Sequence, residues 1–496
     1  MARIIVVGAG FAGLSAASRL AAAGHRVTIL ERRSRPGGRA DAVRIDGATL
    51  DLGPVVLTMV GTLRSIWRAA GRNLDDYLDL IPVEPGYRLA FADSTGPDGA
   101  GVLRTWSDRE RMAEEVRAFA GTRALDEWQR WARWLEELAG TELPTFIEAD
   151  VASVDRLLTR APALWRLWRL GAFGRLDARA ARVLSDPRLR RAVTFQALYA
   201  GVSPQRALGL FGVIAYMDVV LGVVFPRGGM AALGEALGRL CEDLGAELHL
   251  DEPVTHYERT GSRISAVTTP QGRYPADVVV TTEDPLGLGR RLGLGYAKRR
   301  WRLAPSALVV VRYEDAPLPA DLEHHNVFFG QAWEEAFDDL IETRRLMRDP
   351  STLVSLPQRT DPTIAPRGRV VYALEPVPNL NGQLRWPEDA AAARERLEER
   401  LGTFGLARRS DPISEIVLDP EAWAAQGMDA GTPFSFAHTF WQSGPFRAPM
   451  APREFDNLVL AGSGTHPGVG VPLALTSGQL AAARVLADHP GSMVRR

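Results

Sequence analysis

Near its beginning the chain reads Arg3-Ile4-Ile5-Val6-Val7-Gly8-Ala9-Gly10-Phe11-Ala12-Gly13, a β-branched run that ends in three spaced glycines. The β-branched run predicts a short strand, and the Ala/Leu-rich pattern that follows predicts a helix to Ala23. Gly24 ends this helix, and Arg26–Leu30 predicts a second strand. Strand, tight turn, helix and second strand in this order are typical of a Rossmann-like α/β fold.

The three glycines have distinct roles if this turn binds a dinucleotide. Gly8 allows the tight turn, Gly10 lets the backbone approach a pyrophosphate, and Gly13 lets the helix pack closely on the strand. The helix N-terminus then faces the phosphates. Glu31, at the end of the second strand, offers a carboxylate to a ribose diol and would repel a 2′-phosphate, which favours FAD or NAD over NADP. A strand, turn and helix that bind no ligand are the alternative.

The composition is typical of a soluble globular protein. A chain of 496 residues is long for one compact domain, so two domains are the better expectation. With 46% hydrophobic and 24% charged residues it is neither disordered, nor collagen-like, nor an integral multi-span membrane protein. A formal net charge of −1 gives no overall attraction for nucleic acid. The single cysteine, Cys241, excludes an internal disulfide and cysteine-based metal sites and fits a reducing cytosol, so we expect no metal.

The sequence pattern changes twice along the chain. From about Ser107 to Ala215, Leu, Trp and Ala recur at helical spacing between prolines, which predicts a mostly helical insertion. After Pro226 the chain has the pattern of a helix and short strands, and Asn457–Leu486 ends with a strand, a glycine-rich turn and a helix. This order suggests that the chain after Pro226 returns to the sheet that the first two strands begin. We predict a dinucleotide-binding domain of residues 1–75, 226–290 and 450–496, and a discontinuous α+β substrate domain of residues 76–225 and 291–449, in which 107–215 is helical and would face a membrane.

Longer motifs accompany the dinucleotide signature. Arg32-Arg33-Ser34-Arg35-Pro36-Gly37-Gly38-Arg39 follows Glu31, and Asp51-Leu52-Gly53-Pro54-Val55-Val56-Leu57-Thr58 closes a hairpin-like segment. With the Gly-Gly-Arg loop after Glu31, the sequence resembles the flavin amine-oxidase superfamily, in which such an arginine reaches the FAD pyrophosphate. Further motifs make it similar, over nearly its full length, to phytoene desaturase-type carotenoid desaturases: Phe225-Pro226-Arg227-Gly228-Gly229-Met230, Asp361-Pro362 with Ala365-Pro366-Arg367-Gly368, and Gly462-Ser463-Gly464-Thr465-His466-Pro467-Gly468-Val469-Gly470-Val471-Pro472.

The resemblance implies FAD as the cofactor and an FAD-binding domain of the phytoene desaturase type. Gly470, Val471 and Pro472 would lie at the isoalloxazine, where the N–H groups and dipole of the final helix favour the anionic edge of a reduced flavin. Val254 would pack near the adenine, and His466 is interpreted as structural rather than as a base. The predicted FAD-binding residues are Gly8, Ala9, Gly10, Phe11, Ala12, Gly13, Glu31, Arg32, Gly38, Arg39, Gly53, Pro54, Val55, Val254, Gly462, Gly470, Val471 and Pro472.

The activity implied by the resemblance is desaturation of a long apolar polyene, phytoene or a related carotenoid, by hydride transfer to flavin N5. Such a substrate needs an apolar tunnel. The stretches Ala207–Phe225 and Leu164–Phe173 are apolar enough to line such a tunnel, although an ordinary core explains them equally well. Asp218 and three glycines disfavour a transmembrane span in Ala207–Phe225. Asp218 is the candidate base, since burial would raise its pKa; a structural Asp is the favoured alternative.

Membrane contact and the electron acceptor are further expectations. Arg156 to Arg191 holds ten arginines and two acidic residues among Leu and Trp. This composition suits an amphipathic surface on anionic lipid, and a solvated helical face explains it equally well. The lipid-soluble substrate favours the membrane, so we expect a cytoplasmic protein peripheral to it. A second glycine motif that opens a helix is absent from the sequence, so oxygen or a quinone is expected to reoxidise the flavin.

Other activities occur on the same scaffold, and the fold does not choose among them. A carotene isomerase, saturase or oxidase and a natural-product oxidase stay open. An amine oxidase is disfavoured because the sequence shows neither an aromatic cage nor a lysine beside the flavin loop. A non-catalytic escort of prenylated proteins would have lost the dinucleotide signature, and here the signature is intact.

Overall fold

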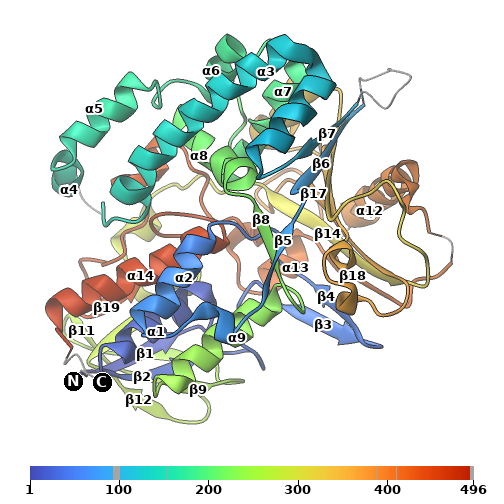
Figure 1. The fold of residues 1–496 in the computed structure, drawn as a ribbon. Coiled ribbons are helices and arrows are strands. Elements are labelled where there is room, and N and C mark those ends of the chain that lie inside the picture. The colour runs from blue at the N-terminus through green and yellow to red at the C-terminus, as the bar shows by residue number, and fades with distance from the viewer. Residues whose placement is uncertain (93–100, 152–153, 387, 409, 492–496) are drawn as a thin grey trace.

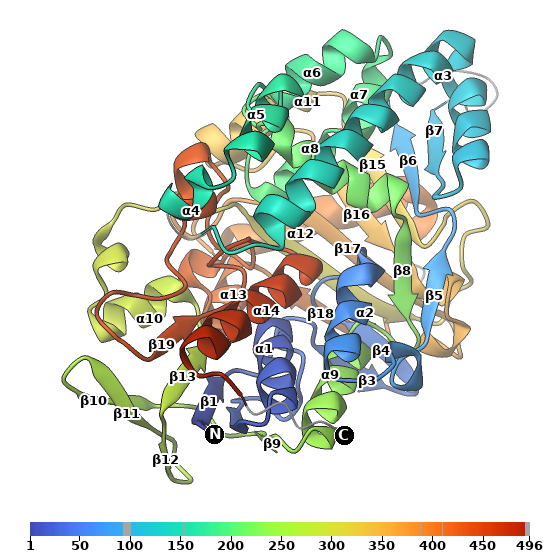
Figure 2. The same cartoon turned by 60° about the vertical axis from the view of Figure 1, so that its left-hand side comes forward.

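The computed structural model describes residues 1–92, 101–151, 154–386, 388–408 and 410–491. Two large sheets and a group of helices form the main parts of the molecule (Figure 1). One sheet has five strands, and the other has seven. Both ends of the described chain lie beside the five-stranded sheet (Figure 1). The helices between residues 109 and 215 lie at the opposite end from the five-stranded sheet, as Figures 1 and 2 both show. The functional site lies where these parts meet.

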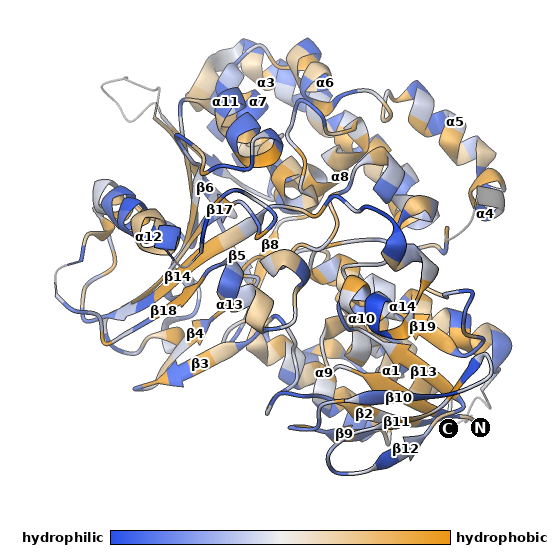
Figure 3. Cartoon of the chain, turned by 180° about the vertical axis from the view of Figure 1, so that it is seen from behind, coloured by the Kyte–Doolittle hydropathy of each residue, from blue (hydrophilic) through white to orange (hydrophobic). Residues whose placement is uncertain are grey.

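The five-stranded sheet is assembled from three separate parts of the chain. Its strands in spatial order are β19 (Leu458–Leu460), β13 (Val278–Thr281), β1 (Arg3–Val7), β2 (Arg26–Leu30) and β9 (Glu247–His249). All neighbours pair in parallel. A parallel sheet is covered on both faces, so its central strands are almost wholly apolar, as their orange colour shows in Figure 3.

Three helices from distant parts of the sequence pack beside this sheet. They are α1 (Phe11–Ala22), α9 (Ala231–Asp243) and α14 (Val471–Asp488), and α1 contacts both of the others (Figure 2). A Cβ atom built on Gly13 would lie 2.0 Å from the carbonyl oxygen of Gly8. Only glycine therefore allows α1 to begin so close to the end of β1. This is the packing role that the sequence motif predicts.

Three smaller sheets accompany the two large ones. They are the hairpin β3 (Ala42–Ile45) and β4 (Ala48–Asp51), the pair β5 (Leu80–Val83) and β8 (Val223–Pro226), and the three-stranded sheet β10 (His256–Thr260), β11 (Arg263–Thr268) and β12 (Arg273–Pro275). The Asp51 carboxylate accepts hydrogen bonds from the N–H groups of Met230, at 2.9 Å, and Ala231, at 3.4 Å. These bonds join the motif that begins with Asp51 to the motif Phe225–Met230, which immediately precedes α9.

The seven-stranded sheet is built from residues of the predicted substrate domain, 76–225 and 291–449. Its strands in spatial order are β18 (Ser414–Leu418), β14 (Ser306–Glu314), β17 (Arg369–Val377), β16 (Thr352–Ser355), β15 (His325–Phe329), β6 (Tyr87–Phe91) and β7 (Val102–Thr105). Helix α12 (Glu388–Leu401) packs on one face through Leu397 and Leu401. The opposite face contributes side chains to a large cavity.

Helices cover the other side of that cavity. They are α3 (Arg109–Glu142), α4 (Val154–Leu158), α5 (Ala161–Arg169), α6 (Leu176–Val183), α7 (Pro187–Ala192) and α8 (Gly212–Ala215). Helices elsewhere are α2 (Val60–Ala69), α10 (Pro285–Leu292), α11 (Trp333–Phe337) and α13 (Pro420–Ala425). The predicted helical insertion is thus present. Within the described ranges, no helix combines the length and the apolar character that crossing a bilayer requires. The stretch 207–225 folds into short helical turns and β8.

Candidate active site

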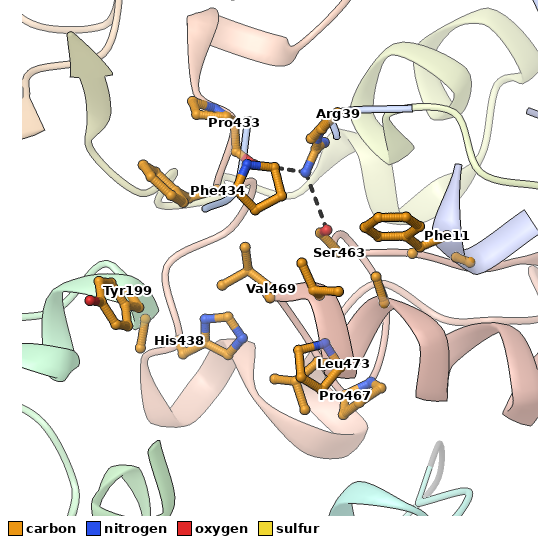
Figure 4. Close-up of a pocket in the computed structure, with 18 of the residues that line it drawn as sticks. Phe11, Arg39, Tyr199, Pro433, Phe434, His438, Ser463, Pro467, Val469 and Leu473 are labelled. Atoms are coloured by element: carbon orange, nitrogen blue, oxygen red, sulfur yellow. Dashed lines mark hydrogen bonds between the residues drawn. The ribbon is translucent and has the colours of Figure 1, made fainter. Parts of the chain in front are cut away.

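A cavity of about 960 Å³ joins the two halves of the molecule (Figure 4). Its polar end is formed by the loops after β1 and β2, and the apolar stretches 164–173 and 207–218 contribute to its other end. Most of the predicted site residues line this one cavity: Gly8, Gly10, Phe11, Ala12, Glu31, Arg32, Gly38, Arg39, Gly53, Pro54, Val55, Asp218, Val254, Gly462, Gly470, Val471 and Pro472. Ala9 and Gly13 do not line it. The N–H of Ala9 donates to Glu31, and Gly13 lets α1 pack closely against the end of β1.

Glu31 is held in place by the backbone around it. Its Oε2 accepts a hydrogen bond from the N–H of Ala9 at 2.6 Å, and its Oε1 accepts one from the N–H of Arg33 at 3.0 Å. The side chain is 5% exposed and still lines the cavity. A carboxylate oxygen can accept more than one hydrogen bond, so Glu31 can bind a diol without giving up these contacts. Val254 lines the same end of the cavity.

Arg39 is a partly buried cation, and its hydrogen bonds to the described residues go to neutral oxygens. Its Nη1 donates to the carbonyl oxygen of Pro433 at 2.7 Å and to Oγ of Ser463 at 3.2 Å, as the dashed lines of Figure 4 show. Burial lowers the pKa of the guanidinium, and the nearby charge of Asp284 partly opposes this. Within the described part of the chain, no carboxylate lies within 4.0 Å of it. A partly buried guanidinium without a carboxylate beside it suits an anionic ligand such as a diphosphate.

The glycine-rich loop 462–472 brings the final helix to the cavity. The N–H of Gly462 donates to Oγ of Ser477 in α14 at 2.9 Å, which fixes the loop against that helix. Gly470 has φ +120°, a conformation that side chains other than glycine rarely adopt, and it immediately precedes the first turn of α14. The N-terminus of α14, with its free N–H groups, therefore lies at the cavity, which Gly470, Val471 and Pro472 line.

Comparison with known proteins gives the family. The chain matches the family described as flavin containing amine oxidoreductase over residues 11–486. The chain belongs to this family. A phytoene dehydrogenase of Streptomyces griseus is 45% identical over 97% of this chain and 94% of that protein. A 4,4′-diapolycopene oxygenase of a Methylomonas species is 31% identical over 98% of each chain. A crystal structure of an oxidoreductase from Methanosarcina mazei has a TM-score of 0.61 at 16% identity, and the match covers 96% of this chain and 99% of that one, which shows the same fold.

These matches confirm the predicted phytoene desaturase-type family, the fold class and FAD as the cofactor. The residues present in this flavoprotein fit that cofactor. Arg39 offers a partly buried positive charge with no carboxylate within 4.0 Å in the described ranges, Glu31 offers a carboxylate for a ribose, and the N-termini of α1 and α14 offer N–H groups. Arg39 and the N-terminus of α1 could hold the pyrophosphate, and the N-terminus of α14 could face the flavin ring.

Asp218 lines the apolar end of the cavity. It lies in the π-helical turn Tyr216–Val220, a conformation that is rare in proteins and frequent at functional sites. The residue is 5% exposed, and its Oδ2 has no hydrogen-bond partner among the described residues. Burial raises the pKa of Asp218 to about 7, although the neighbouring hydroxyl of Tyr87 lowers it in part. Tyr199, which also lines the cavity, is close enough for the charge of Asp218 to raise the pKa of its phenol.

Two further polar residues of the cavity, Glu142 and His438, belong to none of the sequence motifs. Glu142, at the end of α3, lines the cavity, and burial raises the pKa of its carboxyl well above the usual range. His438 also lines it, and burial together with the charge of Arg447 lowers the pKa of this imidazole (Figure 4). Arg447 donates to carbonyl oxygens of the 462–467 loop. His466 interacts with the carbonyl oxygen of Ala149 at 3.1 Å, which agrees with a structural role.

Proposed function

We propose that this flavoprotein desaturates a long apolar polyene of the carotenoid class. The observation that carries the proposal is the continuity of one cavity, which joins the FAD-binding loops to an apolar end. Side chains at that end include Leu164, Leu167, Phe173, Phe195, Leu208, Phe211, Val309, Val327 and Phe337. A hydrocarbon without polar groups fits such a lining.

In this reaction two hydrogens leave neighbouring carbons of the substrate, one as a hydride and one as a proton. Bound FAD supplies the hydride acceptor. Asp218 accepts the proton, because its pKa of about 7 leaves a substantial carboxylate fraction at neutral pH and still makes it a competent base. Tyr87 and Tyr199 lie near this carboxyl group and can orient it. The apolar lining excludes water, which keeps the acid–base exchange at Asp218.

We also propose that the mouth of the cavity rests on a membrane. Apolar side chains near α4, α5 and the loop around residue 440 are exposed although they lie beside lining residues: Leu158 is 64% exposed, Trp165 59%, Trp168 61%, Phe440 49% and Trp441 63%. Helices α4 and α5 project from the body of the molecule in Figures 1 and 3. Exposed tryptophans beside arginines suit the headgroup region of a bilayer, from which a polyene would enter the cavity.

The arginines of residues 156–191 fit this arrangement only in part. Arg166 and Arg169 are exposed on α5 together with Trp165 and Trp168. Arg179, in contrast, lies over the ring of Trp134. The proposed membrane contact is therefore α4 and α5 rather than the whole stretch. We retain oxygen or a quinone as the external electron acceptor in this proposal.

Anaerobic titration of the FAD-loaded protein with carotenoids in liposomes tests the function. Phytoene or a related polyene should bleach the flavin absorbance, and the absorbance of the polyene should move to longer wavelength. A product that has gained oxygen would favour an oxygenase, the activity named for the Methylomonas relative. A changed geometry without flavin bleaching would indicate an isomerase, and bleaching by small amines but by no polyene would refute the assignment.

A further inference from the structure

Glu142 places a carboxyl group in the wall of the cavity. It is the last residue of α3, it lines the cavity, and it is 8% exposed. Its Oε2 is buried and has no hydrogen-bond partner among the described residues. A buried carboxyl oxygen without a hydrogen bond destabilises the folded protein, and most buried polar atoms have a partner. A ligand that enters the cavity can supply the partner that the described protein lacks.

The surroundings of Glu142 are hydrophobic. Ala139, which lies one turn earlier on the same face of α3, and Leu143, the next residue, belong to one hydrophobic cluster. The other members of this cluster are Met59, Ile147, Val213, Ile214, Tyr216, Met217 and Leu473. Burial raises the pKa of the Glu142 carboxyl well above its usual range, and no charged side chain of the described ranges contributes to this shift. The surroundings therefore favour the neutral, protonated carboxyl group.

The wall that contains Glu142 leads from α4 to the flavin loop. The hydrophobic cluster reaches the first turn of α14 through Leu473. After Glu142 the chain forms the π-helical turn Leu143–Ile147, a conformation that is frequent at functional sites, and Phe146, Ile147 and Val151 line the cavity before α4 begins. A molecule that extends from the proposed mouth at α4 and α5 to the flavin loop therefore lies along this wall.

We propose that Glu142 forms a polar subsite of the cavity, which binds the terminal hydroxyl group of a polyene alcohol. The inference rests on the proposed function, which makes a long polyene the occupant of the cavity. A protonated carboxyl group donates one hydrogen bond through its O–H and accepts one at its carbonyl oxygen, and a hydroxyl group can satisfy both. The hydroxyl is terminal because it needs a saturated carbon, which a conjugated polyene has only at its ends.

The subsite makes the cavity selective. A pure hydrocarbon leaves the Glu142 carboxyl group unpaired, whereas the alcohol pairs with it and keeps the rest of its chain against the apolar lining. A site that holds a buried polar group discriminates against a ligand that cannot satisfy that group. The cavity should therefore bind the alcohol more tightly than a hydrocarbon of the same length.

Binding of a matched pair of polyenes to the FAD-loaded protein tests the subsite. The pair is lycopene and rhodopin, which is lycopene hydrated at one terminal double bond and has the same chromophore. Quenching of tryptophan fluorescence should show that rhodopin binds about tenfold more tightly than lycopene, as expected when a buried polar group gains its partner. Glu142→Gln should keep this preference, because an amide both donates and accepts, and Glu142→Leu should lose it.

Glu137→Leu is the matched control. Glu137 is an exposed residue of the same helix and does not line the cavity, so this variant should keep the preference for rhodopin. An unmodified protein that binds both polyenes equally, or a Glu142→Leu protein that still prefers rhodopin, would overturn the subsite.

An infrared measurement identifies the group that rhodopin contacts. The C=O stretching band of the protonated Glu142 carboxyl is assigned by its loss in Glu142→Gln. This band should move to lower wavenumber when rhodopin binds and stay in place with lycopene, because a hydrogen bond to the carbonyl oxygen weakens the C=O bond. A band that rhodopin leaves in place would refute the subsite. A band that moves on addition of FAD to the cofactor-free protein, and not with rhodopin, would assign Glu142 to FAD and refute the subsite as well.

The outcome for the subsite is distinguishable from the outcome for desaturation. Rhodopin binding that depends on Glu142, in a protein that desaturates no polyene, would support the subsite and refute the proposed function. Desaturation of phytoene by a protein without a preference for rhodopin would support the proposed function and refute the subsite. A protein that binds none of rhodopin, lycopene and phytoene would refute both.

Discussion

Replacing Asp218 with Asn is expected to stabilise the protein while it abolishes turnover. The carboxyl group is buried, and its pKa rises from 3.8 to about 7. Each pKa unit corresponds to 1.36 kcal/mol, so a carboxylate at this place costs about 4 kcal/mol relative to the unfolded chain, and local relaxation reduces this to about 2–4 kcal/mol. Asn has nearly the same shape and carries no charge, so it removes this cost.

The sign of the effect depends on pH. The folded pKa of Asp218 lies above the unfolded value, so the favourable contribution of the neutral carboxyl is complete below about pH 4, and it is lost as the pH rises from 4 through about 7. Asp218→Asn should therefore change stability little at pH 4 and raise the midpoint of thermal unfolding by a few degrees at pH 8. Turnover should fall at least a hundredfold, in the range expected for loss of a general base.

Asp361 provides a control of opposite sign. Burial alone would raise the pKa of Asp361, but hydrogen bonds from the N–H of Gly228 at 2.7 Å and from Thr363 outweigh it, and the pKa lies below its ordinary value. Asp361→Asn should therefore lower the unfolding midpoint at pH 8. Differential scanning calorimetry of both variants at pH 4.5 and 8 makes the comparison. An Asp218→Asn protein that is less stable at pH 8 than the unmodified protein, or that keeps its turnover, would refute the reasoning.

Three more outcomes are expected. Glu31→Ala should weaken FAD binding by about 1–3 kcal/mol, because it removes a charged hydrogen-bond acceptor, and cofactor released by heat after dialysis measures this. Gly470→Leu should abolish flavin binding or turnover, since φ +120° strains any residue with a side chain, and flavin fluorescence of the purified protein reports it. Trp165→Ser combined with Trp168→Ser should reduce flotation with anionic liposomes at least fivefold, whereas Ile413→Ser, an exposed apolar residue that does not line the cavity, should not; equal flotation would leave α5 as a solvated face.

Local sequence determines the parts of the fold and site that could be predicted. The strand, glycine turn and helix at residues 3–22 and the glycine loop before α14 carry their own signals, because positive φ values and close backbone contacts restrict the residues that can occupy them. Glu31 follows from its place at the end of β2.

Residues that are defined by contacts across the fold could not be predicted. Tyr87 and Tyr199 come near Asp218 only after β6 and the 195–200 turn are packed together, and neither belongs to a motif. The tryptophans of the helical insertion show the same limit. Trp131 is fully buried and Trp165 is exposed, although both stand among Leu and Arg at helical spacing. Which face of a helix is covered depends on its neighbours in space, and the sequence of one helix does not specify them.

The assembly of the five-stranded sheet from three distant stretches has a consequence for synthesis on the ribosome. Helix α1 leaves the ribosome among the first residues, but α14 and β19, which complete its surroundings, are made after residue 457. During the translation of more than four hundred residues the dinucleotide turn has no finished pocket. Nascent chains truncated before α14 should therefore retain no cofactor and should recruit chaperones through the uncovered apolar face of α1, so FAD can bind firmly only when translation is almost complete.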